Sequence, residues 1–151
     1  MRKLLKGDHV KNNIINIREE AELTQSDMAE ILKVSQSNYS RWETGKEFIP
    51  LSKLNALCNY FCTSMDYALG LSNKNNFKTK NNFSKSIIGK NLKIFRKNKK
   101  ITQKELSEFL NTSQSTISAY EAGKTTLLTS FAYQICNEYK ISLDWLCTNK
   151  K

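Results

Sequence analysis

The residues that most often carry out catalysis or bind metals are few in this chain of 151 residues, which has one histidine and four cysteines. Cys58 and Cys62 are one helical turn apart and could share a metal ion. However, His9 is the only histidine, and no second cysteine pair with ligand spacing follows. Cys58 and Cys136 fall inside apolar helical patterns, where a reduced cysteine packs as a small hydrophobic side chain. We therefore expect no metal, no cofactor and no enzymatic activity.

Glutamine and serine side chains recur in a pattern that suits recognition better than catalysis. Gln36 and Ser37 reappear 78 residues later as Gln114 and Ser115, in each case directly after another serine. A glutamine amide offers one donor and one acceptor, the pair that complements N7 and N6 of adenine. A single polar side chain on a helix surface is usually only solvated. The repetition of the whole set favours a hydrogen-bonding role.

These side chains belong to a repeat that covers most of the chain. A shift of 78 residues aligns positions 8–70 with positions 86–148 without a gap. The identical groups are Thr-Gln, Ser-Gln-Ser, Glu-x-Gly-Lys and Ser-x-Asp, which begin at Thr24, Ser35, Glu43 and Ser64 in the first copy. A fixed repeat of this kind indicates one structural unit used twice. Units of about 65 residues are small but can fold alone.

Each unit is predicted to be all-α, with five short helices. Small polar residues at matching positions predict the helix starts. The expected N-caps are Asp8, Thr24, Ser35 and Ser64 in the first copy and Ser86, Thr102, Ser113 and Ser142 in the second. Asp27 and Glu105 are placed to complete capping boxes. Gly45 and Gly123 are expected to end the third helix in a left-handed conformation.

Apolar residues at helical spacing predict the core. Trp42 and Tyr120 lie on the inward face of the third helix and are expected to be core residues. The other predicted core positions are Val10, Ile14, Ile17, Met28, Ile31, Leu32, Leu51, Leu54, Leu57, Cys58 and Phe61, then Ile88, Leu92, Phe95, Leu106, Phe109, Leu110, Ala132, Ile135, Cys136 and Tyr139.

Residues 72–85 are almost all Asn, Lys, Ser and Thr and show no apolar period. We expect a flexible linker there, between a first domain over residues 1–71 and a second over residues 86–151. Phe77 and Phe83 are the only apolar residues in this linker.

The net charge of +10 is unevenly distributed. Residues 1–71 hold nine Lys and Arg against nine Asp and Glu, and residues 72–86 hold four Lys and no acidic residue. Residues 87–151 hold eleven basic against five acidic residues. A basic surplus suits a polyanionic partner such as nucleic acid, although a solvated basic surface is the common alternative.

No run of eighteen apolar residues is present, and the basic start of the chain over residues 1–6 is too short for a signal peptide. We expect a cytoplasmic protein with no membrane partner.

Two helices joined by a three-residue turn form the helix-turn-helix arrangement, whose second helix enters the major groove of DNA. The chain reads Thr-Gln-x-x-Met-Ala-x-x-Leu from position 24 and Ser-x-x-x-Tyr-Ser-x-Trp-Glu-x-Gly-Lys from position 35, with Pro50 following. The second copy has Ile-Ser-x-Tyr-Glu-x-Gly-Lys from position 117 and Ile-Ser-Leu-Asp-Trp-Leu from position 141. Both copies resemble the lambda-repressor/Cro class of bacterial and phage regulators, often called the XRE family.

The chemistry of the side chains and this resemblance together predict the DNA-binding residues. Gln36 and Gln114 are the expected base readers. The resemblance places Gln25 and Gln103 against DNA phosphates, which the N-termini of their helices also favour. Arg41 could read a guanine, whereas the second copy has Ala119 at that position. The full predicted set is Gln25, Gln36, Ser37, Asn38, Arg41, Lys46, Gln103, Gln114, Ser115, Thr116 and Lys124.

The resemblance also implies a structural ion pair in each copy. Arg18 and Glu43 recur with the same spacing as Arg96 and Glu121. In the resembling family this pair is a salt bridge that joins the first helix to the end of the third.

The resulting hypothesis is a sequence-specific regulator of transcription that binds double-stranded DNA, a repressor of phage, mobile-element or chromosomal type. The alternative is a protein-interaction module, antitoxin-like or antagonist-binding, that uses the same scaffold and takes a protein partner. The chain could pair its units as a homodimer or as an intramolecular pseudo-dimer, because the repeat supplies two potential DNA-binding units.

Overall fold

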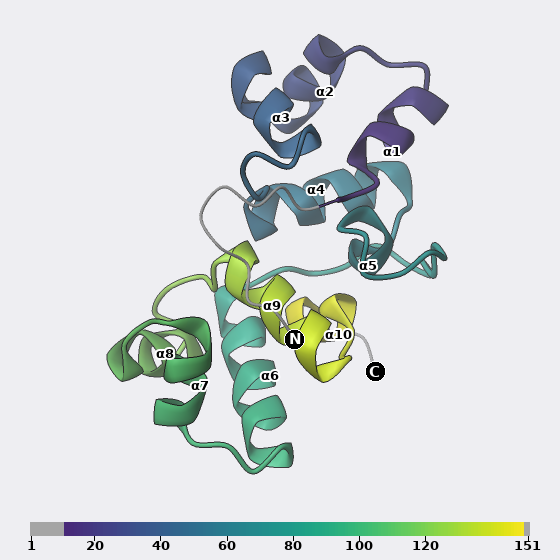
Figure 1. Cartoon of the computed structure of the whole chain (residues 1–151). Coiled ribbons are helices and arrows are strands. Elements are labelled where there is room, and N and C mark those ends of the chain that lie inside the picture. The colour runs from purple at the N-terminus through teal and green to yellow at the C-terminus, as the bar shows by residue number, and fades with distance from the viewer. Residues whose placement is uncertain (1–10, 150–151) are drawn as a thin grey trace. The chain divides into compact units, whose positions relative to one another are not determined.

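The computed structural model describes residues 11–149, and they are helical with no strand (Figure 1). The chain divides into two compact units between Lys80 and Asn81. Among the described residues each unit has five helices, so the predicted all-α architecture is confirmed. Among the described residues, no helix is long and apolar enough to cross a membrane.

The first unit contains α1 (Ile14–Glu20), α2 (Gln25–Leu32), α3 (Gln36–Glu43), α4 (Leu51–Phe61) and α5 (Met65–Ala68). Its core brings together one or more apolar residues from every helix, including Ile14, Met28, Tyr39, Leu54 and Met65, all fully buried. The predicted core residue Trp42 is only 7% exposed, as expected. Ile31 and Phe61 are only partly buried.

The second unit contains α6 (Lys85–Asn98), α7 (Gln103–Leu110), α8 (Gln114–Glu121), α9 (Thr129–Tyr139) and α10 (Leu143–Cys147). Its buried residues include Leu92, Leu106, Ile117, Ile135 and Leu143, one from each helix. Tyr120 is 5% exposed, as predicted, and Cys136 is buried like Cys58 in the first unit. Phe109 and Tyr139 are only partly buried, and their rings meet edge to face at 5.8 Å.

Most of the predicted helix ends are confirmed. Thr24, Ser35 and Ser64 cap their helices in the first unit, and Thr102, Ser113 and Ser142 do so in the second. Thr24 and Asp27 form both bonds of a capping box. Gly45 and Gly123 have the expected positive φ, 78° and 71°.

The start of the first helix differs from the prediction. Asp8, Val10 and His9 lie outside the described residues. Residues 11 and 12 are not helical, and α1 begins at Ile14 after Asn13. The residues before α1 lie against the end of α5: the backbone N–H of Asn13 donates to the carbonyl oxygen of Ala68 at 3.0 Å, and a Cβ on Gly70 would be 2.5 Å from the carbonyl oxygen of Lys11. The backbone of Lys11 thus passes too close to residue 70 for any side chain there.

The start of α6 was also predicted wrongly. Ser84, not Ser86, is the N-cap, and its hydroxyl accepts a hydrogen bond from the backbone N–H of Ile87 at 3.1 Å. Helix α6 can pack directly against the backbone at the end of α8 because residue 89 is glycine. A Cβ on Gly89 would overlap the carbonyl oxygen of Tyr120 and would lie 2.9 Å from that of Glu121.

An asparagine joins the first helix of each unit to the last. Asn13 Nδ2 donates to the carbonyl oxygen of Tyr67 at 2.8 Å. At the matching positions of the repeat, Asn91 Nδ2 donates to the carbonyl oxygen of Trp145 at 2.9 Å. These bonds pair carbonyls near helix C-termini that lack partners within their own helix.

Part of the predicted linker is fixed to the first unit. Asn75 Oδ1 accepts from the backbone N–H of Ser64 at 2.9 Å, and Asn75 Nδ2 donates to the carbonyl oxygen of Cys62 at 3.1 Å. The backbone N–H of Phe77 also donates to Asn75 Oδ1. The segment between this anchor and the cap at Ser84 is therefore shorter than the composition indicated.

Replacing Gly89 with alanine should destabilise the second unit. The added methyl group must push α6 away from the α8 backbone, and overpacking of this kind costs about 1 to 3 kcal/mol. The chain has one tryptophan in each unit. Denaturant unfolding followed by the native indole N–H signal of Trp145 in NMR reports on the second unit, and that of Trp42 on the first.

Lys90→Ala is the matched control, because Lys90 follows Gly89 in α6 but is exposed. That substitution should change the free energy of unfolding by less than about 0.5 kcal/mol. Equal effects of the two substitutions would contradict the assigned contact between α6 and α8.

Candidate nucleic-acid interface

In each unit the second and third helices are joined by three residues. Residues 33–35 connect α2 to α3, and residues 111–113 connect α7 to α8. The first residue of each connection, Lys33 or Asn111, has a left-handed backbone with φ of 59° or 56°. Such a residue ends one helix and turns the chain sharply into the next. Helices α3 and α8 are called the recognition helices below.

The first turn of α3 presents polar side chains to solvent. Gln36, Ser37 and Asn38 are all exposed. The Ser35 hydroxyl caps the helix by accepting from the backbone N–H of Asn38 at 3.2 Å, and it lies 3.3 Å from the Ser37 hydroxyl. Gln36 therefore projects from a well-capped helix end.

The first turn of α8 is similar with one difference. Gln114 and Ser115 are exposed, and Ser113 caps the helix through the backbone N–H of Thr116. Thr116 is only partly exposed, and its hydroxyl lies 2.7 Å from that of Ser113. Thr116 thus has a role within the cap that Asn38 lacks at the matching position.

A buried hydrogen-bonded cluster fixes the far end of α3. Arg18 Nε and Nη2 donate to the two carboxylate oxygens of Glu43 at 2.8 and 2.9 Å. Arg18 Nη1 donates to the carbonyl oxygen of Leu23, in the loop before α2, at 2.9 Å. Gln25 Nε2 donates to Glu43 Oε1 at 3.3 Å. One carboxylate thus joins α1, α2 and α3.

The second unit repeats this cluster atom for atom. Arg96 donates to Glu121 at 2.7 and 3.0 Å and to the carbonyl oxygen of Ile101 at 3.1 Å. Gln103 Nε2 lies 3.3 Å from Glu121 Oε1. The ion pair that the resemblance implied is present in both units.

This cluster gives Gln25 and Gln103 hydrogen-bond partners within the protein. Both side chains are partly buried, and each donates one amide hydrogen to a glutamate. An amide NH₂ carries two hydrogens. The glutamate therefore holds the amide in place at the N-terminus of α2 or α7 and leaves its second hydrogen for another acceptor.

The electrostatics of the first cluster depend on Arg18. The Glu43 side chain is only 2% exposed. Burial alone would raise the pKa of Glu43, but hydrogen bonds from Arg18 and Gln25 lower it below its ordinary value. The hydrogen bond to Glu43 in turn raises the pKa of Arg18. Both groups are therefore charged at neutral pH.

Farther along α3, the two units differ. Arg41 lies one turn after Ser37 and is exposed, and its Nη1 atom is 3.5 Å from Glu47 Oε1. The backbone N–H of Glu47 donates to the carbonyl oxygen of Arg41 at 3.1 Å, which keeps the two residues together. The second unit has Ala119 and Thr125 at these positions. Glu47 was not predicted from the sequence, because helical periodicity gives no information about residues in the loop after α3.

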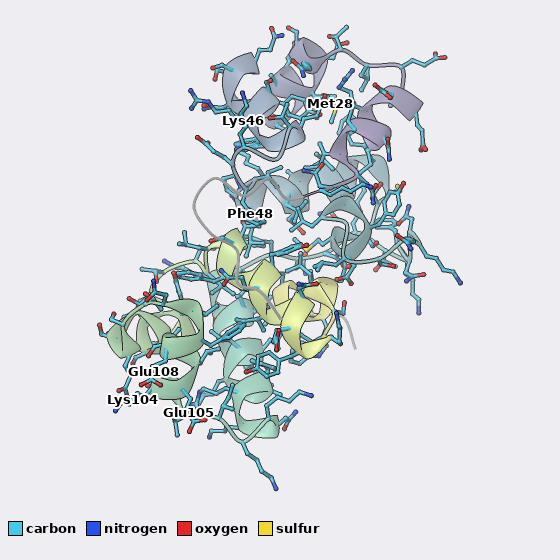
Figure 2. All side chains as sticks on the ribbon, viewed as in Figure 1. Met28, Lys46, Phe48, Lys104, Glu105 and Glu108 are labelled. Carbon is cyan, nitrogen blue, oxygen red and sulfur yellow. The ribbon has the colours of Figure 1, made fainter. Side chains whose placement is uncertain are left out.

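Lys46 is exposed in the loop that follows α3 (Figure 2), and Lys124 is exposed in the loop that follows α8. The carbonyl oxygen of Lys124 accepts from Lys85 Nζ at 3.3 Å, which adds another basic side chain beside this loop.

Elsewhere in the second unit, Lys104, Glu105 and Glu108 project together from α7 (Figure 2). Within residues 11–149, no group of three His, Cys, Asp or Glu side chains is placed to hold a metal ion.

Replacing Arg18 with methionine should destabilise the first unit by about 3 to 5 kcal/mol, because it strands the buried Glu43 carboxylate. The double variant Arg18→Met/Glu43→Met should recover most of this loss. Arg41→Met removes an exposed arginine from a surface pair and should cost at most about 1 kcal/mol. Denaturant unfolding followed by the NMR signal of the Trp42 indole N–H measures the free energy of unfolding of all three variants.

The contribution of Glu43 to the free energy of unfolding should depend on pH with opposite sign in the wild type and in the Arg18→Met variant. In the wild type the pKa of folded Glu43 is depressed, so its contribution is complete above pH about 4.3 and is lost as the pH falls through the folded pKa. Without Arg18, burial raises the pKa of Glu43, so the variant should regain stability on acidification. If the wild type and the Arg18→Met variant lost stability to a similar degree on acidification, the assigned role of Arg18 would be contradicted.

Comparison with protein families agrees with this geometry. Residues 16–67 match a family model described as a helix-turn-helix domain, and residues 89–151 match a second model with the same description. No curated protein and no solved structure is significantly similar to the chain. Each match includes a pair of helices joined by three residues, α2 and α3 or α7 and α8. The chain therefore carries two helix-turn-helix domains in tandem.

Proposed function

We propose that this chain binds double-stranded DNA in a sequence-specific manner and acts as a transcriptional repressor of the lambda-repressor/Cro class. The observation that carries this proposal is the exposed glutamine on the first turn of each recognition helix. That is the part of a recognition helix that contacts base edges in this arrangement.

The buried clusters support the same proposal. Glu43 and Glu121 tie each recognition helix to the N-terminal end of the helix before it. In the proposed complex, Gln25 and Gln103 donate to phosphates and Gln36 and Gln114 face a groove. A preformed arrangement lowers the entropic cost of binding.

The difference between the recognition helices suggests an asymmetric DNA site. Arg41 can donate to O6 and N7 of a guanine after it leaves Glu47, whereas Ala119 can at most contact a thymine methyl group. An exposed ion pair contributes about 0 to 1 kcal/mol, so breaking the pair between Arg41 and Glu47 to bind a guanine costs little. We propose that the first unit prefers a guanine-containing half-site.

We further propose that one chain acts as a covalent pseudo-dimer, with one recognition helix in each of two successive major grooves. Residues 76–83, between the Asn75 anchor and the Ser84 cap, span at most about 29 Å when extended. This short tether favours half-sites about 34 Å apart, one turn of the duplex, over sites two turns apart.

Replacing Gln36 or Gln114 with alanine should reduce discrimination at one base pair by about 1 to 3 kcal/mol, with the fold intact. The two substitutions should affect different half-sites. Selection of bound sequences from a random duplex pool measures both effects.

Gln134→Ala is the control, because Gln134 Nε2 donates to the carbonyl oxygen of Ser130 within α9. It should leave the selected sequence unchanged. A folded Gln36→Ala/Gln114→Ala double variant that selects the wild-type sequence would show that α3 and α8 do not read bases.

Footprinting combined with mass measurement of the complex tests the pseudo-dimer. One chain should protect two half-sites about 34 Å apart, because each unit supplies its own recognition helix. A complex that always contains two chains, with only one unit of each on the DNA, would refute this arrangement.

A further inference from the structure

A stripe of four exposed lysines runs along α6 and the turn that follows it. The four are Lys90, Lys93, Lys97 and Lys100. Residues spaced by three or four positions lie on one side of a helix. Lys100 stays next to Lys97, because its backbone N–H donates to the carbonyl oxygen of Lys97 at 3.1 Å. None of the four lysines forms an ion pair with another residue between 11 and 149, so the stripe presents its charge to solvent.

The matching turn of the first unit has the opposite charge. The four matching residues are Asn12, Ile15, Glu19 and Glu22. The backbone is the same in both places, with φ of 57° at Glu22 and 58° at Lys100. The N–H of Glu22 donates to the carbonyl oxygen of Glu19 at 3.0 Å, as that of Lys100 does to Lys97. The turn therefore forms with either charge, and the lysines are not needed for the fold.

The stripe lies between two residues of the second unit that are predicted to bind DNA. At one end, Lys100 is three residues before Gln103, the first residue of α7. At the other end, α6 begins beside the loop after α8, because Lys85 Nζ donates to the carbonyl oxygen of Lys124 at 3.3 Å. The lysines thus extend the predicted DNA contacts along the side of the unit.

The length of the stripe suits a DNA strand. Helix α6 rises about 10 Å from Lys90 to Lys97, and Lys100 lies just beyond its end. One strand of B-DNA carries a charge about every 3.4 Å along the duplex axis. A helix laid along that strand can therefore face roughly three or four successive phosphates. Lysine ammonium groups bind phosphates as flexible point charges.

We propose that this stripe binds the phosphates of one strand of duplex DNA, whatever the base sequence, and makes the second unit the anchor of the chain on DNA. This inference rests on the proposed function and names a further contact surface for it. The first unit has glutamates at the same turn, which repel phosphates. Its affinity for DNA therefore depends more on base contacts by Gln36 and Arg41.

The test uses the full-length chain with two probes, the duplex selected from the random pool and the unselected random duplex pool. Lys97→Glu/Lys100→Glu gives the second unit the residues that the first unit has in the same turn. It should weaken binding of both probes by a similar factor, at least tenfold. The slope of log affinity against log salt should become shallower by about 2, because each lost phosphate contact removes about 0.9.

Lys99→Glu/Lys140→Glu is the matched control, because it makes the same change in charge within the same unit. Lys99 lines a cavity with Ile141, and Lys140 directly precedes Ile141, so both lie beside this cavity and outside the stripe. Binding of both probes should weaken less than about threefold, and the salt slope should change by less than about 0.5. The native NMR signal of the Trp145 indole N–H shows that the second unit of each variant is folded.

Equal losses in the two variants would overturn the proposal, because net charge alone would then explain them. A loss confined to the selected duplex would also overturn it, because the lysines would then act in base recognition. Tighter binding of a random single-stranded pool than of the duplex pool by the wild type would exclude duplex DNA as the ligand of the stripe. Failure of sequence-specific recognition gives a different result: no sequence is enriched, while the difference between the variants on random duplex persists.

Discussion

Glu43 and Glu121 each hold a carboxylate almost out of contact with water, and the arginine opposite compensates that charge through two hydrogen bonds. A buried charge without such a partner is strongly destabilising, so the first helix of each unit must lie where its arginine can reach. The same arginine binds the loop before the second helix, and the carboxylate also accepts from that helix's first glutamine. The relative positions of three helices thus follow from one ion pair.

The two units share this framework and differ at several exposed positions. The cluster distances agree within 0.2 Å between Arg18–Glu43 and Arg96–Glu121. The asparagine bond from the first helix to the last is also repeated. By contrast, Arg41 and Glu47 are replaced by Ala119 and Thr125. Exposed positions tolerate such changes because they affect stability little, whereas a change in a buried network leaves a partner unsatisfied.

The same framework also permits different surroundings at the last helix. In the first unit Asn75 folds back onto the residues before α5, and in the second the equivalent residues before α10 line an open cavity. The backbone of the two places is nearly the same.

The sequence by itself determined the features that depend on neighbouring residues. The number of helices, the caps at Thr24, Ser35 and Ser64, and the left-handed Gly45 follow from local hydrogen bonding and φ preferences. Only the tertiary structure decided the start of α1, the extension of α6 past α8, the anchoring of Asn75 and the glutamate partner of Gln25. Each of these depends on a contact between residues distant in the chain, such as Lys11 with Gly70 or Gly89 with Tyr120. Helical periodicity cannot predict such contacts, because it identifies the buried face of a helix but not the segment of backbone that packs against that face.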